Sequence, residues 1–299
     1  MKVNPIKRIL TPTDFSKNGN LAVKQAASMA SKHKAELYIL HAVEIPVSAF
    51  NVYSYDMVQE DISGITKTAQ NKLNEIVTQI NKEFSIAVKA ICSTGNPAQA
   101  IRAAVTNKKI DVVVMGTHGA HGFNEHFAGS NAQKTVSLCS CPVITFQLNA
   151  KRTGFNNIVL PIDDCFESRQ KVDFTIALAK KYNSKMHILG VTDQSLESEI
   201  EKFKVKLVSV EKAAKKAGVN FITKILRTNN FGLETLRYAR KVKADLISVL
   251  TDHESKYDGK FLGLFAQKIV NHSKTPVLSI HPVELGVYDP VSLAGSNSN

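Results

Sequence analysis

The chain repeats itself, and this duplication constrains its fold more than any other feature. Residues 9–14 (Ile-Leu-Thr-Pro-Thr-Asp) resemble residues 158–163 (Ile-Val-Leu-Pro-Ile-Asp), which lie 149 positions later. Near the end of each copy, residues 141–144 (Cys-Pro-Val-Ile) match residues 275–278 (Thr-Pro-Val-Leu) at an offset of 134. The second copy therefore lacks 15 residues, and residues 44–64 are the candidate surplus of the first. A repeat of this size predicts two related domains, 1–148 and 155–283, and an unstructured tail, 284–299.

Within each copy, short apolar segments alternate with longer amphipathic ones. The apolar segments of the first copy are residues 8–12, 37–43, 86–92, 112–115 and 143–146. Helical spacing of apolar residues predicts helices between them, over residues 20–33, 65–84 and 97–106, with a last helix after Gly129. Such an alternation is typical of a parallel sheet covered on both faces. We expect an α/β fold with two tandem doubly wound, Rossmann-like domains.

Composition narrows the class of protein. The 299 residues are 43% hydrophobic and 21% charged, as in ordinary globular proteins. No apolar stretch approaches the roughly 20 residues of a membrane span, and no apolar block follows the basic start as in a signal peptide. Four cysteines in a chain of this length are no disulfide framework. These features predict a cytoplasmic protein without a membrane partner.

The net charge of +12 is spread over both halves. A basic balance favours anionic partners but defines no site, and a solvated lysine-rich surface explains it equally well. We expect no specific nucleic-acid partner, only weak binding that disappears near physiological salt.

Glycines follow the fourth apolar segment at a regular spacing. Gly116 and Gly119 are separated by two residues, and nine more precede Gly129-Ser130. Glycine lets a backbone turn and approach a ligand, and a loop of exposed N–H groups beside a helix start suits phosphates. Plain turn glycines and a helix-capping Ser130 are the alternative.

An acidic residue ends the first strand. Asp14 follows Pro12-Thr13, where ligands bind in open α/β sheets, outside the carboxyl ends of the strands. A carboxylate at that place can accept both ribose hydroxyls. The alternative is that Asp14 caps the next helix.

Together these residues resemble the universal stress protein family. Its ATP-binding signature, Gly-x2-Gly-x9-Gly-Ser/Thr, is matched from Gly116 to Ser130, its strand-one motif by Pro12-Thr13-Asp14, and its closing strand by Cys141-Pro142-Val143. The resemblance covers residues 4–148 closely and 155–282 in outline. It implies the family's adenine-nucleotide alpha-hydrolase-like fold.

The resemblance also implies a ligand. ATP would bind the first copy, with Asp14 meeting ribose and adenine, Ala42 meeting adenine through its backbone, and Mg²⁺ held by phosphates and water. The expected binding residues are Pro12, Thr13, Asp14, Ala42, Gly95, Met115, Gly116, His118, Gly119, Gly129, Ser130 and Asn131. The family pairs its last strands, which predicts a pseudo-dimer within the chain and leaves a homodimer open.

The second copy departs from the signature. At the offset of 134, Gly116, Gly119 and Ser130 become Leu250, His253 and Leu264, whereas Gly129 stays glycine as Gly263. Asp14 keeps its acid as Asp163. We expect a degenerate second site, because added side chains should close the backbone cradle.

Three functions remain open. The first is an ATP-binding stress or signalling module, the second a slow ATPase or self-phosphorylating protein, and the third an interaction scaffold without nucleotide. No P-loop or nucleophile-elbow motif is present, and no catalytic base is evident.

Three further interpretations concern side chains outside the signature. His118, His121 and His126 match no standard metal site, Cys139 and Cys141 are interpreted as small buried thiols, and His41 and His187 as satisfied core or rim histidines.

Overall fold

The structure is a computed structural model. It describes residues 4–44, 55–117, 130–147, 154–164, 170–251 and 264–282, with backbone alone for 55–61, Ser130 and Leu264. The proposed tail, 284–299, lies outside these ranges. Among the described helices, none has the length and apolar character needed to cross a bilayer.

The first half is a five-stranded parallel sheet in the order β3-β2-β1-β4-β5. Its strands are β1 (Arg8–Pro12), β2 (Glu36–Val43), β3 (Val88–Thr94), β4 (Val112–Gly116) and β5 (Val143–Phe146). Its helices are α1 (Lys17–His33), α3 (Tyr55–Phe84), α4 (Pro97–Lys108) and α5 (Ser130–Leu138).

The second half has the corresponding order, β8-β7-β6-β9-β10. Its strands are β6 (Asn157–Ile162), β7 (Lys185–Thr192), β8 (Asn220–Arg227), β9 (Leu246–Leu250) and β10 (Val277–Ile280). Its helices are α6 (Val172–Tyr182), α7 (Glu197–Ala217), α8 (Phe231–Lys241) and α9 (Leu264–His272). The expected doubly wound α/β fold, twice over, is confirmed.

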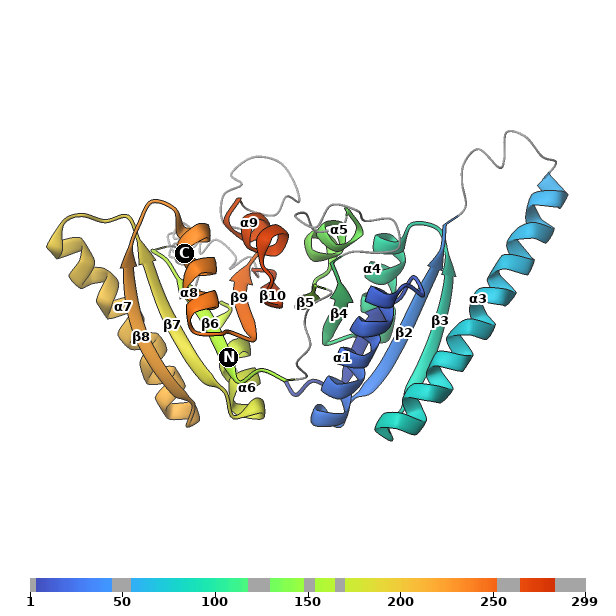
Figure 1. Cartoon of the computed structure of the whole chain (residues 1–299), viewed down its shortest axis with the longest axis horizontal. Coiled ribbons are helices and arrows are strands. Elements are labelled where there is room, and N and C mark those ends of the chain that lie inside the picture. Colours follow the sequence, from blue (N-terminus) through green and yellow to red (C-terminus); the bar gives the residue numbers. More distant parts are fainter. Residues whose placement is uncertain are drawn as a thin grey trace, which may run out of the picture.

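The two halves join through their last strands. β5 and β10 pair antiparallel, with Ile144 opposite Leu278, and all ten strands form one sheet (Figure 1). Gln133 Nε2 donates to Asn271 Oδ1 across the seam at 2.8 Å, from α5 to α9. Pairing covers two edges that would otherwise offer free N–H and C=O groups. The strand pairing expected within the chain is therefore present.

The inner strands bury both of their faces, whereas the outer strands β3 and β8 are partly exposed. Leu37 and Ile39 of β2 belong to the core that α1, α3, α6 and α7 cover, whereas Tyr38 and Leu40 belong to the core under α4, α5, α8 and α9. Side chains alternate along a strand, so an apolar run fills two cores at once. This explains why continuous Val, Ile and Leu runs predict these strands.

The main departure from the predicted elements is α3. The helix begins at Tyr55, ten residues before the expected start at Ile65, and continues through Gly64. It has 30 residues, whereas its counterpart α7 has 21. Much of the surplus of the first copy is therefore helix rather than loop. β3 also starts two residues later than predicted, at Val88.

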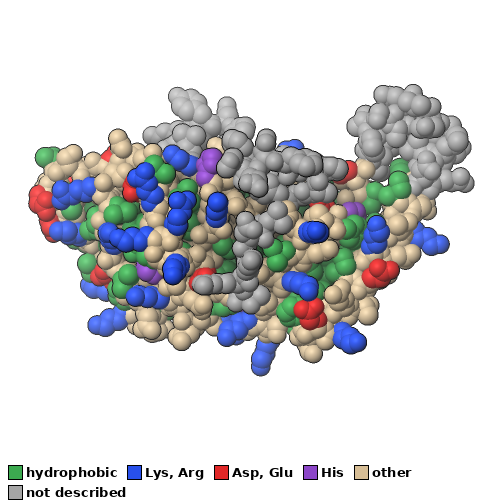
Figure 2. Space-filling view, in the orientation of Figure 1, with side chains coloured by type: hydrophobic (Ala, Val, Ile, Leu, Met, Phe, Trp, Pro, Cys, Tyr) green, Lys and Arg blue, Asp and Glu red, His purple; other side chains and the backbone are tan. Residues whose placement is uncertain are grey.

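The excess of Lys and Arg over Asp and Glu is spread over the face of the molecule that Figure 2 shows. Figure 2 shows Lys and Arg side chains over both halves, with fewer acidic ones between them.

Candidate functional site

The carboxyl ends of β1, β2 and β4 lie at one edge of the first half, here called the carboxyl edge. β1 pairs with β2 on one side and β4 on the other, so the strand order reverses at β1 and the connections diverge. Such a switch point leaves a crevice between divergent connections, where α/β proteins bind ligands. Pro12 ends β1, Ala42 lies near the end of β2, and Gly116 ends β4.

The loop after β1 is held by its own short hydrogen bonds. Thr13 N donates to Leu40 O at 2.8 Å, which continues the β1–β2 ladder by one residue. Asp14 Oδ1 accepts from Ser16 N at 3.1 Å and from Ser16 Oγ at 2.5 Å. Ser16 Oγ in turn accepts from Gly19 N at 3.1 Å as the cap of α1. Asp14 therefore supports the helix cap indirectly, yet its side chain is exposed at the carboxyl edge.

Two residues that the sequence analysis did not single out shape this loop. Phe15 has a φ of 63°, a conformation that bulky residues seldom adopt. At Gly19, an added Cβ would lie 2.7 Å from Asp14 Oδ1 and 2.9 Å from Thr13 Oγ1. Gly19 is thus the residue that lets the Asp14 carboxylate approach the start of α1. The only sequence signal was a glycine three residues after a capping serine.

The loop that connects β3 to α4 also lies at the carboxyl edge. Gly95 has a φ of 103° and donates its N–H to Val43 O at 2.8 Å. A Cβ at Gly95 would have nothing within 4 Å, so its backbone angle, not crowding, calls for glycine. Asn96 then caps α4 by accepting from Ala98 N at 3.1 Å, with Pro97 in the first turn.

The end of β4 supplies the remaining described part of the signature. Met115 is buried in the core under α4 and α5, and Gly116 is in register with Phe146 of β5. Thr117 N donates to Phe146 O at 2.9 Å, extending the ladder. Ser130 begins α5 and Asn131 is its half-buried second residue. His118, Gly119 and Gly129 lie outside the described residues, as do His121 and His126.

The cysteines behave as structural thiols where they are described. Cys139 is 1% exposed, and burial raises the pKa of its thiol to about 12. Cys141 is half-buried rather than buried as expected, and burial likewise raises the pKa of its thiol to about 12. Thiols held protonated are poor nucleophiles, which supports the interpretation as packing residues. Cys165 lies outside the described residues.

His41 is a rim residue with a specific partner. Its Nδ1 lies 2.8 Å from Thr13 O, and since a carbonyl oxygen only accepts, Nδ1 carries the hydrogen of this bond. The imidazole therefore braces the loop that presents Asp14. His187 in the second half instead lies 3.2 Å from Tyr238 Oη through Nδ1, and it is buried. Both histidines are satisfied, as expected.

At the equivalent edge of the second half, the α6–α7 side is occupied by side chains that pair with one another. Asp164, beside Asp163, accepts from Lys206 Nζ at 3.1 Å and from Thr192 Oγ1 at 3.2 Å. Leu250 is fully buried, and its side chain belongs to the core covered by α6 and α7, not to the α8–α9 side. Leu250 thus packs inward rather than closing the α8–α9 side directly. His253 and Gly263 lie outside the described residues.

Solved structures share the whole architecture. The crystal structure of a universal stress protein from Archaeoglobus fulgidus aligns with 93% of this chain and 99% of its own, with a TM-score of 0.74 and 18% identity. At this identity the likeness concerns the fold.

Curated relatives correspond to one half of the chain. Universal stress protein MJ0531 of Methanocaldococcus jannaschii is 30% identical over 141 residues, which are 47% of this chain and 82% of the relative. Universal stress protein YxiE of Bacillus subtilis is 27% identical over 142 residues, 46% of this chain and 96% of the relative. The model of the universal stress protein family matches twice, at residues 5–147 and 154–281. With two tandem matches and the same doubly wound fold in each half, this chain belongs to the universal stress protein family.

Proposed function

We propose that the chain binds one adenine nucleotide, ATP with its Mg²⁺, at the carboxyl edge of the first half. The observation that carries the proposal is the Asp14 loop. The exposed Asp14 carboxylate lies at the switch point of the sheet. Ser16 hydrogen-bonds it, and the missing Cβ of Gly19 leaves space for it. A carboxylate so held can accept hydrogen bonds from ribose hydroxyls at little further cost in side-chain entropy.

The surrounding residues fit such a ligand. Ala42 lies near the end of β2, where the Gly95–Val43 hydrogen bond closes the β2–β3 edge, and adenine would contact the Ala42 backbone there. Gly116, Ser130 and Asn131, with Gly119 and Gly129, would surround the phosphates at the start of α5. Mg²⁺ would be held by phosphate and water oxygens.

The first half would be the nucleotide domain, residues 1–148, and the second half, 155–283, a degenerate partner. In the second half Leu250 and Leu264 replace Gly116 and Ser130 of the signature, while Asp164, Lys206 and Thr192 pair with one another on the α6–α7 side of the edge. Nucleotide occupancy would then act as the signal of a cytoplasmic stress-response module. Slow hydrolysis, self-phosphorylation and a scaffold without nucleotide are the alternatives that the experiment must separate.

Calorimetric titration with ATP and Mg²⁺ tests the proposal through matched variants. Asp14→Asn should weaken binding about 10- to 100-fold, because charge-assisted hydrogen bonds to the ribose are lost, and Asp163→Asn should not change it. Gly129→Asp should abolish binding through bulk and negative charge, whereas Gly263→Asp should not. A stoichiometry of two, or equal losses in both members of a pair, would contradict a single site.

Mass spectrometry of small molecules released on denaturation separates binding from scaffolding. An adenine nucleotide that copurifies with the parent and not with Gly129→Asp supports the proposal. Its absence, together with no calorimetric binding, supports the scaffold. Phosphate release that exceeds the Gly129→Asp background over many turnovers would identify an ATPase instead.

A further inference from the structure

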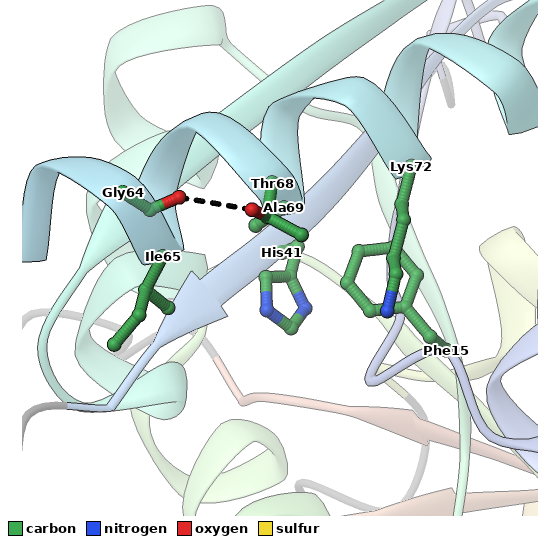
Figure 3. A pocket seen from close by; sticks show the side chains of 7 residues that line it. All are labelled: Phe15, His41, Gly64, Ile65, Thr68, Ala69 and Lys72. Carbon is green, nitrogen blue, oxygen red and sulfur yellow. Dashed lines mark hydrogen bonds between the residues drawn. The ribbon is translucent and has the colours of Figure 1, made fainter. Parts of the chain in front are cut away.

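A cavity lies on the opposite face of the sheet from the proposed nucleotide contacts. It has a volume of about 500 Å³ and lies between the end of β2, the loop after β1 and helix α3 (Figure 3). His41 and Phe15 are on the α1–α3 side of the sheet, whereas Ala42 and Met115 pack on the α4–α5 side. The residues that line it are Phe15, His41, Gly64, Ile65, Thr68, Ala69 and Lys72. We call it the α3 pocket.

The lining combines flat faces with one positive charge. The rings of Phe15 and His41 are 4.2 Å apart between centroids and inclined by 31°. Lys72 Nζ lies 5.6 Å from the centroid of the Phe15 ring, over its face. Ile65 is 55% exposed and adds aliphatic surface, and none of the described lining residues is acidic. Such a lining suits a planar apolar group that carries a negative charge.

The second half shows that the fold does not require this pocket. At the offset of 149, His41 corresponds to Gly190, and at 134, Ala69 corresponds to Phe203. A Cβ at Gly190 would lie 2.9 Å from a ring carbon of Phe203, so the α7 ring covers the strand directly. Phe203 is fully buried, whereas the imidazole of His41 is half-buried at a pocket. The two pairs of side chains have similar total size, so the exchange changes polarity and access more than packing volume.

The charged residues at this place also differ between the two halves. Lys72 corresponds to Lys206, and Phe15 corresponds to Asp164. In the second half the carboxylate of Asp164 pairs with Lys206 at 3.1 Å. In the first half Phe15 replaces that carboxylate, and Lys72 has no ion pair among the described residues. The ligand would supply the carboxylate that the first half lacks.

We propose that the α3 pocket binds a small aromatic monocarboxylate, with its ring beside Phe15 and His41 and its carboxylate at Lys72. The His41–Thr13 hydrogen bond links the pocket to the loop that presents Asp14. The site itself does not depend on nucleotide binding, so it can be tested without ATP.

The probe is 2-naphthoate, titrated into the full-length protein without nucleotide and followed by its fluorescence and by calorimetry. We expect one site per chain, with about three- to tenfold weaker binding of the neutral isostere 2-naphthalenemethanol. Lys72→Gln should weaken naphthoate binding by the same factor. Lys67→Gln, an exposed lysine of the same helix outside the pocket, is the matched control and should leave it unchanged.

A transplant of the second half's arrangement tests the place of binding. The double variant His41→Gly/Ala69→Phe conserves size, and circular dichroism with a thermal melt checks that it folds. It should lose naphthoate binding. Equal affinity for the neutral isostere, no effect of Lys72→Gln, binding retained in a folded double variant, or no binding at all would each overturn the proposal. So would loss of naphthoate binding in Asp14→Asn, which would place the probe in the nucleotide site instead.

Discussion

Strands β2 and β7 occupy the same place in the two halves, yet they are covered in opposite ways. In β2 the ring near the end of the strand belongs to the strand itself, as His41, and it hydrogen-bonds the loop after β1. In β7 the strand has Gly190, and the ring comes from the helix, as Phe203. The first arrangement leaves the α3 pocket open at the carboxyl edge, and in the second the Phe203 ring fills the equivalent place. A duplicated fold can thus keep the same sheet in both copies while a pocket present in one copy is filled by side chains in the other.

The Phe203 ring fills the place in the second half that is equivalent to the α3 pocket. Removing this ring gives the largest expected change in stability. Phe203→Ala should lower the free energy of unfolding by about 3–5 kcal/mol, because it removes a fully buried ring above a glycine that cannot fill the gap. Urea denaturation measures it. Ala69→Gly at the equivalent place of α3 should cost only about 1 kcal/mol, as a helix glycine does. Equal losses at the two positions would mean that the halves are packed alike.

Substitutions at two glycines should affect different properties, one the stability of the fold and the other the proposed ATP binding. Gly190→Ala places a Cβ 2.7 Å from a Leu207 methyl and should cost about 1–3 kcal/mol of stability without changing nucleotide affinity. Gly19→Ala places a Cβ 2.7 Å from Asp14 Oδ1 and should instead weaken the proposed ATP binding about tenfold by displacing the carboxylate. Denaturation and calorimetry on both variants check this crossed pattern. If Gly19→Ala leaves ATP affinity unchanged, the position of Asp14 does not matter.

Much of this architecture could be predicted because it follows from local patterns. The apolar runs predicted β1 and β5 to the residue, and the helix predicted from residue 97 begins at Pro97 in the structure. The pairing of the last strands followed from the family resemblance and from the need to cover sheet edges.

The pocket beside α3 was beyond sequence reasoning. Polar Thr68 and Lys72 are compatible with any solvated helix face, and His41 in an apolar strand indicated only a satisfied ring. Their meeting depends on the path of α3 across the sheet, which no local pattern specifies. The predicted helix begins only at Ile65, whereas α3 begins at Tyr55 and passes through Gly64, where an added Cβ would meet nothing within 4 Å.

The seam offers a pH-dependent comparison of two equivalent positions. His33 and Tyr182 correspond at the offset of 149, and their rings lie 5.7 Å apart between centroids. Burial, with Lys181 and Lys32 nearby, lowers the pKa of His33 to about 4. The unfolded chain therefore binds more protons between about pH 6.5 and 4, so stability is complete above that window and falls as the pH drops through it.

His33→Gln removes this titration and makes it measurable. Between pH 7.5 and 5.0 the parent should lose about 1 kcal/mol more stability than the variant, a value reduced for the partial exposure of the ring. Urea midpoints at the two pH values test this. His187, whose pKa is also lowered by burial, is present in both proteins and cancels. An equal pH dependence in the two proteins would show that His33 is solvated in the folded state.

The smallest expected effect tests whether the second half satisfies its own charges. Lys206 pairs with Asp164 at 3.1 Å, and both side chains are more than a third exposed. Such pairs contribute little, so Lys206→Gln should cost about 0.5 kcal/mol at low salt and less at 1 M salt, where screening is strong. Lys72→Gln should change stability by less than that at either salt concentration, because its charge lies over a ring rather than beside a carboxylate. Urea denaturation of both variants at the two salt concentrations gives the comparison. A salt-dependent loss in Lys72→Gln as large as in Lys206→Gln would mean that the first half also supplies its own counter-charge, and the α3 pocket would then have no need of an anionic ligand.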